Sequence, residues 1–488
     1  MNFEQKVGHA TKWSTITEFL TKLTTPLTNA ILVRLLEPEA FGMVATLSLI
    51  ITFAEIFTDA GFQKYIVQHE FENEEDMNLS TDVAFWTNLV LSFLIWFLIA
   101  IFVHPIAYLL GATGHETAII IIGGQIPLLG FSSIQMARYR RGFAFKDLFV
   151  VRMIIATVPL IITIPCAVIL RSYWALLLGT LGRDLLRAVV FSMRSGWKPS
   201  FRFSVRKLKE MISFSIWSII ENIMIWLSTN LGTIIVSTTL GVYYIGLYKT
   251  TNTTVFGYMG MFTVSTMPVL FSALSRCQND RDLFESIYFK FQRMVAIIIF
   301  PLGFGCLVYR DLVTILLLGS QWKETSGYLG MLFFTYAMEI IFSHYNSEAF
   351  RSQGKPRMSV LAQLIYIMVK IPLFVWSAQY GYTALTVITC VSSYILIILT
   401  STIARFSLGI HFTNVLCNVC PALFAACVMA IAGTLLRTVF DNIVWEFFTV
   451  FLCVLIYAAV MLILPSGRKQ LAEIPVLRKA FHLHVPNE

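Results

Sequence analysis

The chain has 488 residues, of which 57% are hydrophobic and only 13% are charged. A soluble globular domain carries about 25% charged residues, so this composition excludes an ordinary soluble protein. Apolar runs long enough to cross about 30 Å of hydrocarbon recur from end to end of the chain. We therefore predict an all-α polytopic membrane protein, and we attribute its net charge of +8 to membrane topology rather than to nucleic-acid binding.

The apolar runs predict about fourteen transmembrane helices. In chain order they cover residues 12–36, 40–65, 82–110, 117–139, 147–170, 173–194, 205–240, 242–274, 285–309, 326–351, 358–380, 382–406, 413–437 and 443–465. We group them into an N-terminal lobe (1–203, helices 1–6), a C-terminal lobe (204–410, helices 7–12) and two appended helices (411–466). Residues 467–488 would then form a cytoplasmic tail.

The distribution of lysine and arginine supports this order, because cytoplasmic loops of membrane proteins are enriched in both. Alternate connections are strongly basic, as in the segment with Arg138, Arg140, Arg141 and Lys146, and the connections between them are not. Both termini are therefore predicted to lie in the cytoplasm. The longest external connection, residues 310–325, is expected to dip into the membrane interface. Because no segment is long enough for a soluble catalytic domain, we do not expect an enzyme.

Two parts of the chain resemble each other. Gly42, which follows the turn at Pro38, corresponds to Gly246, and Glu18 corresponds to Glu221. Both halves begin on the cytoplasmic side, so the repeat is parallel and implies an axis along the membrane normal with a substrate path between the lobes. The sequence thus predicts two pseudo-symmetric six-helix lobes plus two C-terminal helices. Gly42 is expected to allow close packing where the second helix begins.

Seven charged residues fall well inside the predicted spans: Glu18, Lys22, Glu55, Glu221, Lys249, Glu339 and Lys370. At roughly 3 kcal/mol each against lipid, together they would cost about 20 kcal/mol, which exceeds the net stability of an ordinary protein. They must therefore face one another or water. Two interpretations stay open: ion pairs that fix helix packing, such as Glu18 with Lys22 one turn later, or a hydrophilic lumen for an anionic headgroup.

Other polar features indicate less. Arg183 and Arg187 lie near the predicted cytoplasmic interface, where arginines set topology and bind acidic lipid heads. The histidines and cysteines show no metal-ligand spacing, so no metal site is predicted. The sequence contains no G-x-x-x-x-G-K-[ST] motif, so we expect no ATP hydrolysis on this polypeptide.

The stretch "LVRLLEPEAFGMVATLSLIITFAEIFTDAGFQKYIVQ" resembles the first hairpin of Wzx-type polysaccharide exporters of the MOP superfamily. That hairpin reads L-x-R-x-L-x-P-x-D/E-F-G and ends in a Gly-Phe followed by an I-V-Q-like tail. Weaker similarities are "RYRRGFAFKDLF", "LLLGSQWKETSGYLGMLFF" and "FRSQGKPR". The chain looks closest to the colanic-acid and teichuronic-acid exporter subgroup. It departs from the family at 63–65, where "QKY" replaces small apolar residues.

The resemblance implies a flippase that moves undecaprenyl-diphosphate-linked oligosaccharide repeat units across the bacterial cytoplasmic (inner) membrane by alternating access, for lipopolysaccharide or exopolysaccharide biosynthesis. Basic residues of a central cavity would hold the diphosphate, and the positions that match are Lys22, Arg34, Arg152, Lys249 and Lys370. Acidic residues would couple transport to H⁺ or Na⁺, with no other cofactor, and the candidates are Glu18, Asp59, Glu221 and Glu339.

Two other classes of function are compatible with these features. A cation-coupled small-molecule antiporter of the related MATE type is the main alternative, and efflux of cationic drugs would favour it. A membrane glycan polymerase or ligase is disfavoured because the chain lacks a large external loop. For the flippase, the expected partners are the lipid-linked oligosaccharide, membrane lipids, and a polysaccharide polymerase with its chain-length machinery. No nucleic acid is expected.

Overall fold

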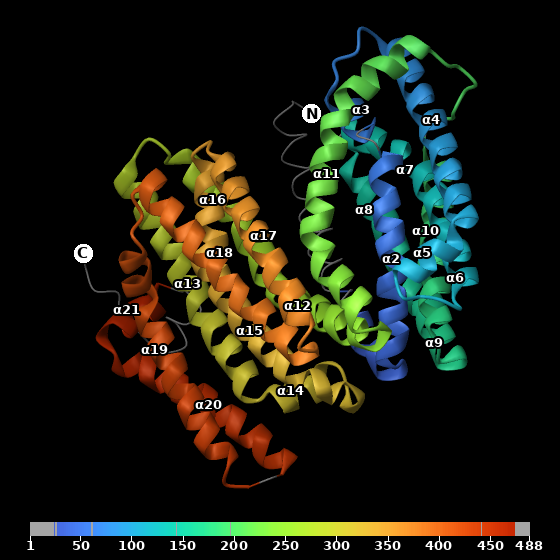
Figure 1. Ribbon diagram of the computed structural model, residues 1–488. Coiled ribbons are helices and arrows are strands. Elements are labelled where there is room, and N and C mark those ends of the chain that lie inside the picture. The colour runs from blue at the N-terminus through green and yellow to red at the C-terminus, as the bar shows by residue number, and fades with distance from the viewer. Residues whose placement is uncertain are drawn as a thin grey trace. The chain divides into compact units, whose positions relative to one another are not determined.

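A computed structural model describes residue 24 and residues 27–59, 62–142, 144–195, 197–440 and 442–473. In these ranges the secondary structure is helical, with no strands (Figure 1). Nine helices within them are long and apolar enough to cross a membrane, or ten if the bent pair Val242–Thr263 and Thr266–Arg276 forms one span. The all-α polytopic membrane fold is therefore confirmed, and the number of fourteen spans stays a prediction.

The chain divides into two compact units between Thr250 and Thr251, and each is described by itself. The helices that lie wholly in the first unit are α2 (Pro38–Asp59), α3 (Phe62–Gln68), α4 (Glu74–Ile101), α5 (Val103–Leu109), α6 (Glu116–Gly123), α7 (Gln125–Arg141), α8 (Phe145–Ala156), η1 (Pro159–Thr163), α9 (Ile164–Leu170), α10 (Tyr173–Arg194) and α11 (Val205–Thr239). Helix α11 packs on α2, α3 and α4 of this unit. The lobe boundary predicted at residue 203 therefore precedes the last full helix of the first unit.

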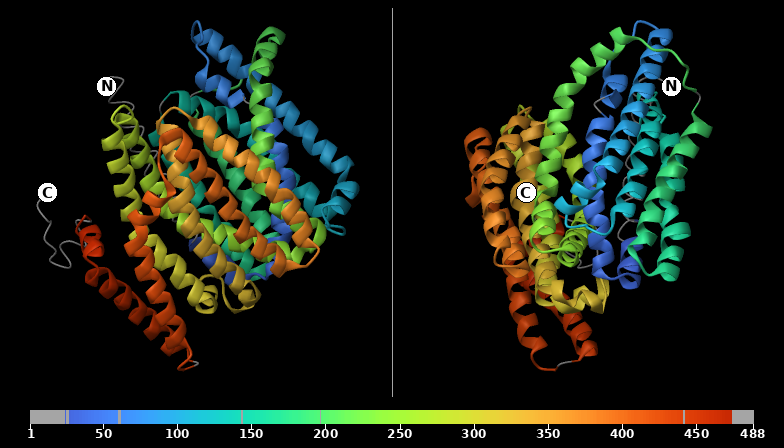
Figure 2. Two further views of the ribbon diagram at one scale, coloured as in Figure 1. Left: turned by 60° about the vertical axis from the view of Figure 1, so that its left-hand side comes forward. Right: turned by 45° about the vertical axis from the view of Figure 1, so that its right-hand side comes forward.

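Helix α12 (Val242–Arg276) begins in the first unit and continues into the second. The second unit also contains α13 (Arg281–Val308), α14 (Arg310–Leu317), η2 (Ser320–Thr325), α15 (Ser326–Glu339), η3 (Ile340–His344), α16 (Tyr345–Ser352), α17 (Pro356–Ala378), α18 (Tyr382–Leu408), α19 (Phe412–Arg437), α20 (Ile443–Ile463) and α21 (Pro465–Ala472). Large aromatic side chains, among them Trp322, Tyr288 and Phe300, are fully buried in its core. Helices α19 and α20 form a hairpin that packs on α13 (Figure 2).

Local signals explain where the helices depart from the predicted bounds. Helix α4 begins at Glu74 rather than at residue 82, because Asn73 caps it by accepting a hydrogen bond from the backbone N–H of Asp76 at 2.8 Å. Acidic residues in the first turn favour this start through the helix dipole. The helix ends at Ile101, and α5 continues after Phe102, so the predicted single helix over 82–110 is broken there.

Two of the predicted helices contain a π-helical turn. Pro159–Thr163 separates α8 from α9, and Ile340–His344 separates α15 from α16. Proline explains the first break, because it cannot donate to the helical ladder and crowds the preceding turn. The second has no proline; π-helical turns of this kind occur frequently at functional sites. It follows directly on Glu339, one of the predicted lumen residues.

The first hairpin packs against the start of α12 through two glycines. A Cβ atom on Gly42 would overlap the backbone carbonyl of Val242, and a Cβ on Gly246 would overlap that of Pro38. These contacts are reciprocal between the positions that the sequence repeat pairs. The expected close packing at Gly42 is therefore confirmed, and its partner is the equivalent glycine of the second half.

Candidate functional site

A polar cavity of about 460 Å³ lies inside the first unit, among α2, α3, α7, α10 and α11. Each of three helices contributes residues spaced three or four apart, so that each presents one face to the cavity. On α7 these include Leu129, Ser132, Ser133 and Met136, and on α11 they are Asn222, Trp226, Thr229 and Asn230. Helix α2 adds Thr52 and Glu55, α3 adds Gln63, and α10 adds Arg187 and Phe191.

A cluster of charges adjoins the cavity. Asp184 on α10 is only 1% exposed, and its Oδ1 lies 3.3 Å from Nε of Arg183 and 3.5 Å from an Nη of Arg187. Arg187 also interacts electrostatically with Glu55 of α2 and Arg152 of α8. These three arginines and two carboxylates leave one positive charge in excess. The first unit therefore holds a net cationic site inside its helix bundle.

The composition of this site suits an anionic, hydroxyl-rich ligand. Arginine matches phosphate through paired N–H donors, and hydroxyl and amide side chains both donate and accept hydrogen bonds. The second carboxylate oxygen of Asp184, Oδ2, is buried and has no hydrogen-bond partner among the described residues. A cavity of about 460 Å³ lies within the usual range for small-molecule sites. It can hold a headgroup or a few sugar rings.

A second polar cavity, of about 640 Å³, lies in the second unit between α12 and the η3–α16 segment. His344, Glu348 and Arg351 line it, with Glu348 and Arg351 paired at 2.9 Å. His344 also lies 3.7 Å from Glu339 across the π-helical turn. The two cavities use elements that correspond in the sequence repeat, since α2 and α7 match α12 and the α15–α16 region.

The predicted basic residues occupy different environments. Arg152 joins the charged cluster of the first unit. Arg34 is exposed, and Lys249 is half-buried with no ion-pair partner among the described residues. In the second unit, the ammonium group of Lys370 lies over the rings of Tyr366 and Phe374, at 5.1 and 4.8 Å from their centroids. Lys22 lies outside the described residues.

Of the predicted acidic residues, Glu339 borders the second cavity through His344. Glu18 and the side chains of Asp59 and Glu221 lie outside the described part of the chain. The first cavity adds two residues that the predicted site does not include, Glu55 and Arg187. Arg187 lines this cavity, and its predicted place near the cytoplasmic interface stays a prediction. The spacing of Arg183, Asp184 and Arg187 on one helix, combined with Glu55 inside the facing span, is the signal that could have found them.

Comparison with known proteins shows the family to which the chain belongs. Residues 31–327 match the family described as polysaccharide biosynthesis protein, and the chain belongs to this family. Its relatives include the lipopolysaccharide biosynthesis protein WzxC of Escherichia coli (strain K12), 24% identical over 68% of this chain and 67% of WzxC. The succinoglycan biosynthesis transport protein ExoT of Rhizobium meliloti (strain 1021) is 25% identical over 62% of this chain, which spans 61% of ExoT. An uncharacterized membrane protein in the cps region of Klebsiella pneumoniae is 22% identical over 78% of this chain and 79% of that protein.

Solved structures show the fold. The lipid II flippase MurJ in an inward closed conformation superposes with a TM-score of 0.71, at 16% identity over 92% of this chain and 97% of that structure. An inward-facing multidrug resistance MATE family transporter of the MOP superfamily superposes with a TM-score of 0.61, at 13% identity over 80% of this chain and 98% of that structure. The chain therefore has the MOP transporter fold.

Proposed function

We propose that this protein is a flippase that moves undecaprenyl-diphosphate-linked oligosaccharide repeat units across the bacterial cytoplasmic membrane by alternating access. The observation that carries the proposal is the polar cavity of the first unit, with Arg187, Asp184 and Glu55 inside a bundle of membrane-spanning helices. A buried cationic site would be costly in lipid unless it served a polar ligand or an ion. The family and the named exporter relatives support the same substrate class.

In this proposal Arg187, with Arg152 and Arg183 beside it, holds the diphosphate while hydroxyl and amide side chains of the cavity contact the first sugars. Glu339 with His344 in the second unit is a candidate for coupling to H⁺ or Na⁺, because a carboxylate beside an imidazole can exchange a proton or a cation. Both termini would face the cytoplasm. The released repeat unit would pass to a polymerase and its chain-length machinery.

Gene deletion with complementation tests the function. Deletion should abolish the surface glycan and cause the lipid-linked repeat unit to accumulate inside the cell, and the wild-type gene should reverse both effects. The variant R187A should fail to complement, and R206A is its control, because Arg206 is exposed and its partner among the described residues is Glu210, one turn along α11. Surface glycan that persists in the deletion strain, with no internal build-up, would contradict the proposal.

The MATE-like fold supports a second candidate, a cation-coupled small-molecule antiporter. The two functions differ in what accumulates on deletion. An antiporter deletion would sensitise cells to cationic drugs and leave the lipid-linked pool unchanged. Measuring drug sensitivity in the same strains separates the two.

A further inference from the structure

An apolar groove of about 1270 Å³ lies in the first unit. Side chains of α2, α3, α4, α5 and α11 line it, and Thr87 is the one aliphatic hydroxyl among the described lining residues. On α11 the lining residues run from Leu208 to Ile234. At 1.5 Å per residue this is about 39 Å of helix, more than the roughly 30 Å hydrocarbon core of a bilayer. The groove is therefore long enough for an extended chain that crosses both leaflets.

The groove adjoins the polar cavity through a thin partition. Trp226 lines both, and its indole N–H donates a hydrogen bond to the Thr52 hydroxyl at 3.0 Å. Thr52 lines the polar cavity, whereas Phe53, the next residue, lines the groove and packs on Trp226 with ring centroids 4.9 Å apart. Trp226 thus borders both the cavity that contains Arg187 and the apolar groove.

We infer that this groove seats the polyprenyl chain of the lipid-linked glycan while the headgroup occupies the polar cavity. This inference rests on the proposed function and adds to it the place of the tail. A single long hydrocarbon chain carrying a phosphorylated, hydroxylated head matches the adjacent apolar and polar spaces. A bulk phospholipid matches less well, because its headgroup stays at the bilayer surface. The polar cavity lies deeper than that, because Thr52, which lines it, lies fourteen residues after Pro38 in α2, or about 21 Å from that end of the helix.

The groove orients the substrate and contributes little to its binding free energy. Lipid tails are as apolar as the groove, so moving the chain from the bilayer into it gains little hydrophobic free energy. Holding the tail beside Trp226 instead raises the effective concentration of the head at the arginines. Filling the groove should therefore slow export strongly even where the protein folds and inserts normally.

Photo-crosslinking in living cells tests the occupant directly. A benzophenone amino acid replaces Leu98, a groove residue that is 43% exposed, or Phe97, its neighbour on α4 that is 63% exposed and outside the groove. We expect the position-98 adduct to carry a polyprenyl-linked saccharide, and this adduct should be lost in a strain lacking the first glycosyltransferase of the glycan. The position-97 adduct should contain phospholipid. Only phospholipid at both positions, or an adduct with another part of the chain at position 98, would overturn the inference.

A groove-filling variant gives a second readout. V90W places an indole in the groove at a residue that is 65% exposed, and F97W is the matched control. With equal protein in the membrane, V90W should lose most surface glycan and F97W should retain it; unchanged export by V90W would contradict the inference. Intact export in the gene deletion strain would refute the proposed function itself. Export lost on deletion, with phospholipid alone at position 98, would refute only the location of the tail.

Discussion

Asp184 lies buried between two arginines of its own helix. Its carboxylate pairs with Arg187, which faces the cavity, and with Arg183, whose side chain is 42% exposed. Removing one partner of a buried ion pair leaves an uncompensated charge, which costs about 3–5 kcal/mol when both are fully buried. The partial exposure of both arginines lowers this figure here. Asp184 therefore supports the shape and the charge of the site together.

The first prediction concerns this pair. D184N should lower the melting temperature of the purified protein in detergent, because Arg187 loses its buried partner. R183Q should lower it much less, because water already screens that side chain. The double variant D184N/R187Q should recover part of the loss, since coupled residues give non-additive effects. Additive losses in the double variant would show that the two side chains do not interact.

We propose Lys249 as a substrate ligand, because it is half-buried and has no ion-pair partner in the described ranges. A buried ammonium without a counter-ion is destabilising unless a ligand supplies one. K249A should therefore reduce export at least about tenfold, the equivalent of 1.4 kcal/mol, at unchanged protein level. K249R should retain part of the activity. Surface glycan normalised to membrane protein is the measurement, and wild-type export by K249A would remove Lys249 from the site.

The candidate site was only partly predictable from the sequence. Glu55 inside a span and the spacing of Arg183, Asp184 and Arg187 show that these residues are polar faces of helices. Periodicity does not show which other helix a face meets, because that depends on contacts between distant segments. The sequence therefore shows neither that Arg187 shares a cavity with Glu55 nor that Lys370 lies over the rings of Tyr366 and Phe374.

At the scale of elements, the crossing of α2 and α12 depends on Gly42 and Gly246. A methyl group at either position would overlap a backbone carbonyl, which cannot move without separating the helices. G42A and G246A should each destabilise the protein by about 1–3 kcal/mol, the usual cost of overpacking. G260A on the same helix α12 is the control, because no described atom outside its own stretch of helix lies within 4 Å of the added Cβ. Thermal unfolding in detergent measures all three, and equal stability of G246A and G260A would contradict the close crossing.

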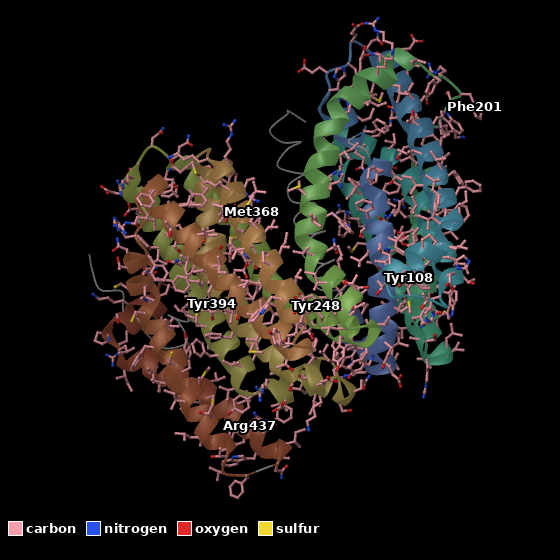
Figure 3. All side chains as sticks on the ribbon, in the orientation of Figure 1. Tyr108, Phe201, Tyr248, Met368, Tyr394 and Arg437 are labelled. Atoms are coloured by element: carbon pink, nitrogen blue, oxygen red, sulfur yellow. The ribbon has the colours of Figure 1, made fainter. Side chains whose placement is uncertain are left out.

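Within the second unit, Arg437 at the end of α19 links α14 to α20, and Figure 3 labels this residue. Its guanidinium lies 2.7 Å from Asp311 of α14 and 2.9 Å from Glu446 of α20. Partial burial acts to raise the pKa of Asp311, but hydrogen bonds from Arg437 and Ser326 outweigh it and hold this pKa below the ordinary value. The stabilisation is therefore fully present above the unfolded pKa of about 4, and it is lost as the pH falls through the lower folded value.

The lowered pKa of Asp311 predicts that its contribution to stability depends on pH. At pH 7, D311N should be less stable than the wild type by about 1 kcal/mol, since the pair is partly exposed. At pH 3 the difference should shrink, because the wild-type carboxylate becomes protonated as well. Melting temperatures of both proteins at the two pH values provide the measurement. A difference that is equal at pH 3 and pH 7 would show that the Asp311 charge does not contribute.

For the whole molecule, the membrane class and the family could be predicted because they depend on local features: apolar runs and the first-hairpin motif. Most helix positions could be predicted for the same reason. The predicted bounds differ from the observed ones where capping at Asn73 or the π-helical turn at 340–344 changes the local hydrogen bonding. The two cavities could not be predicted, because each is built from helices far apart in the sequence. The groove could not be predicted either, because the sequence pattern of its apolar residues is the same as that of ordinary lipid-facing positions.

Reconstitution tests the central claim most directly. Purified protein in liposomes that contain the lipid-linked oligosaccharide should make the saccharide on the inner leaflet accessible to an external glycan-cleaving enzyme. Protein-free liposomes should keep the saccharide of the inner leaflet protected. The R187A variant should strongly slow the rate at which this saccharide becomes accessible. Equal rates with wild-type protein and without protein would contradict the assignment of this chain as a flippase.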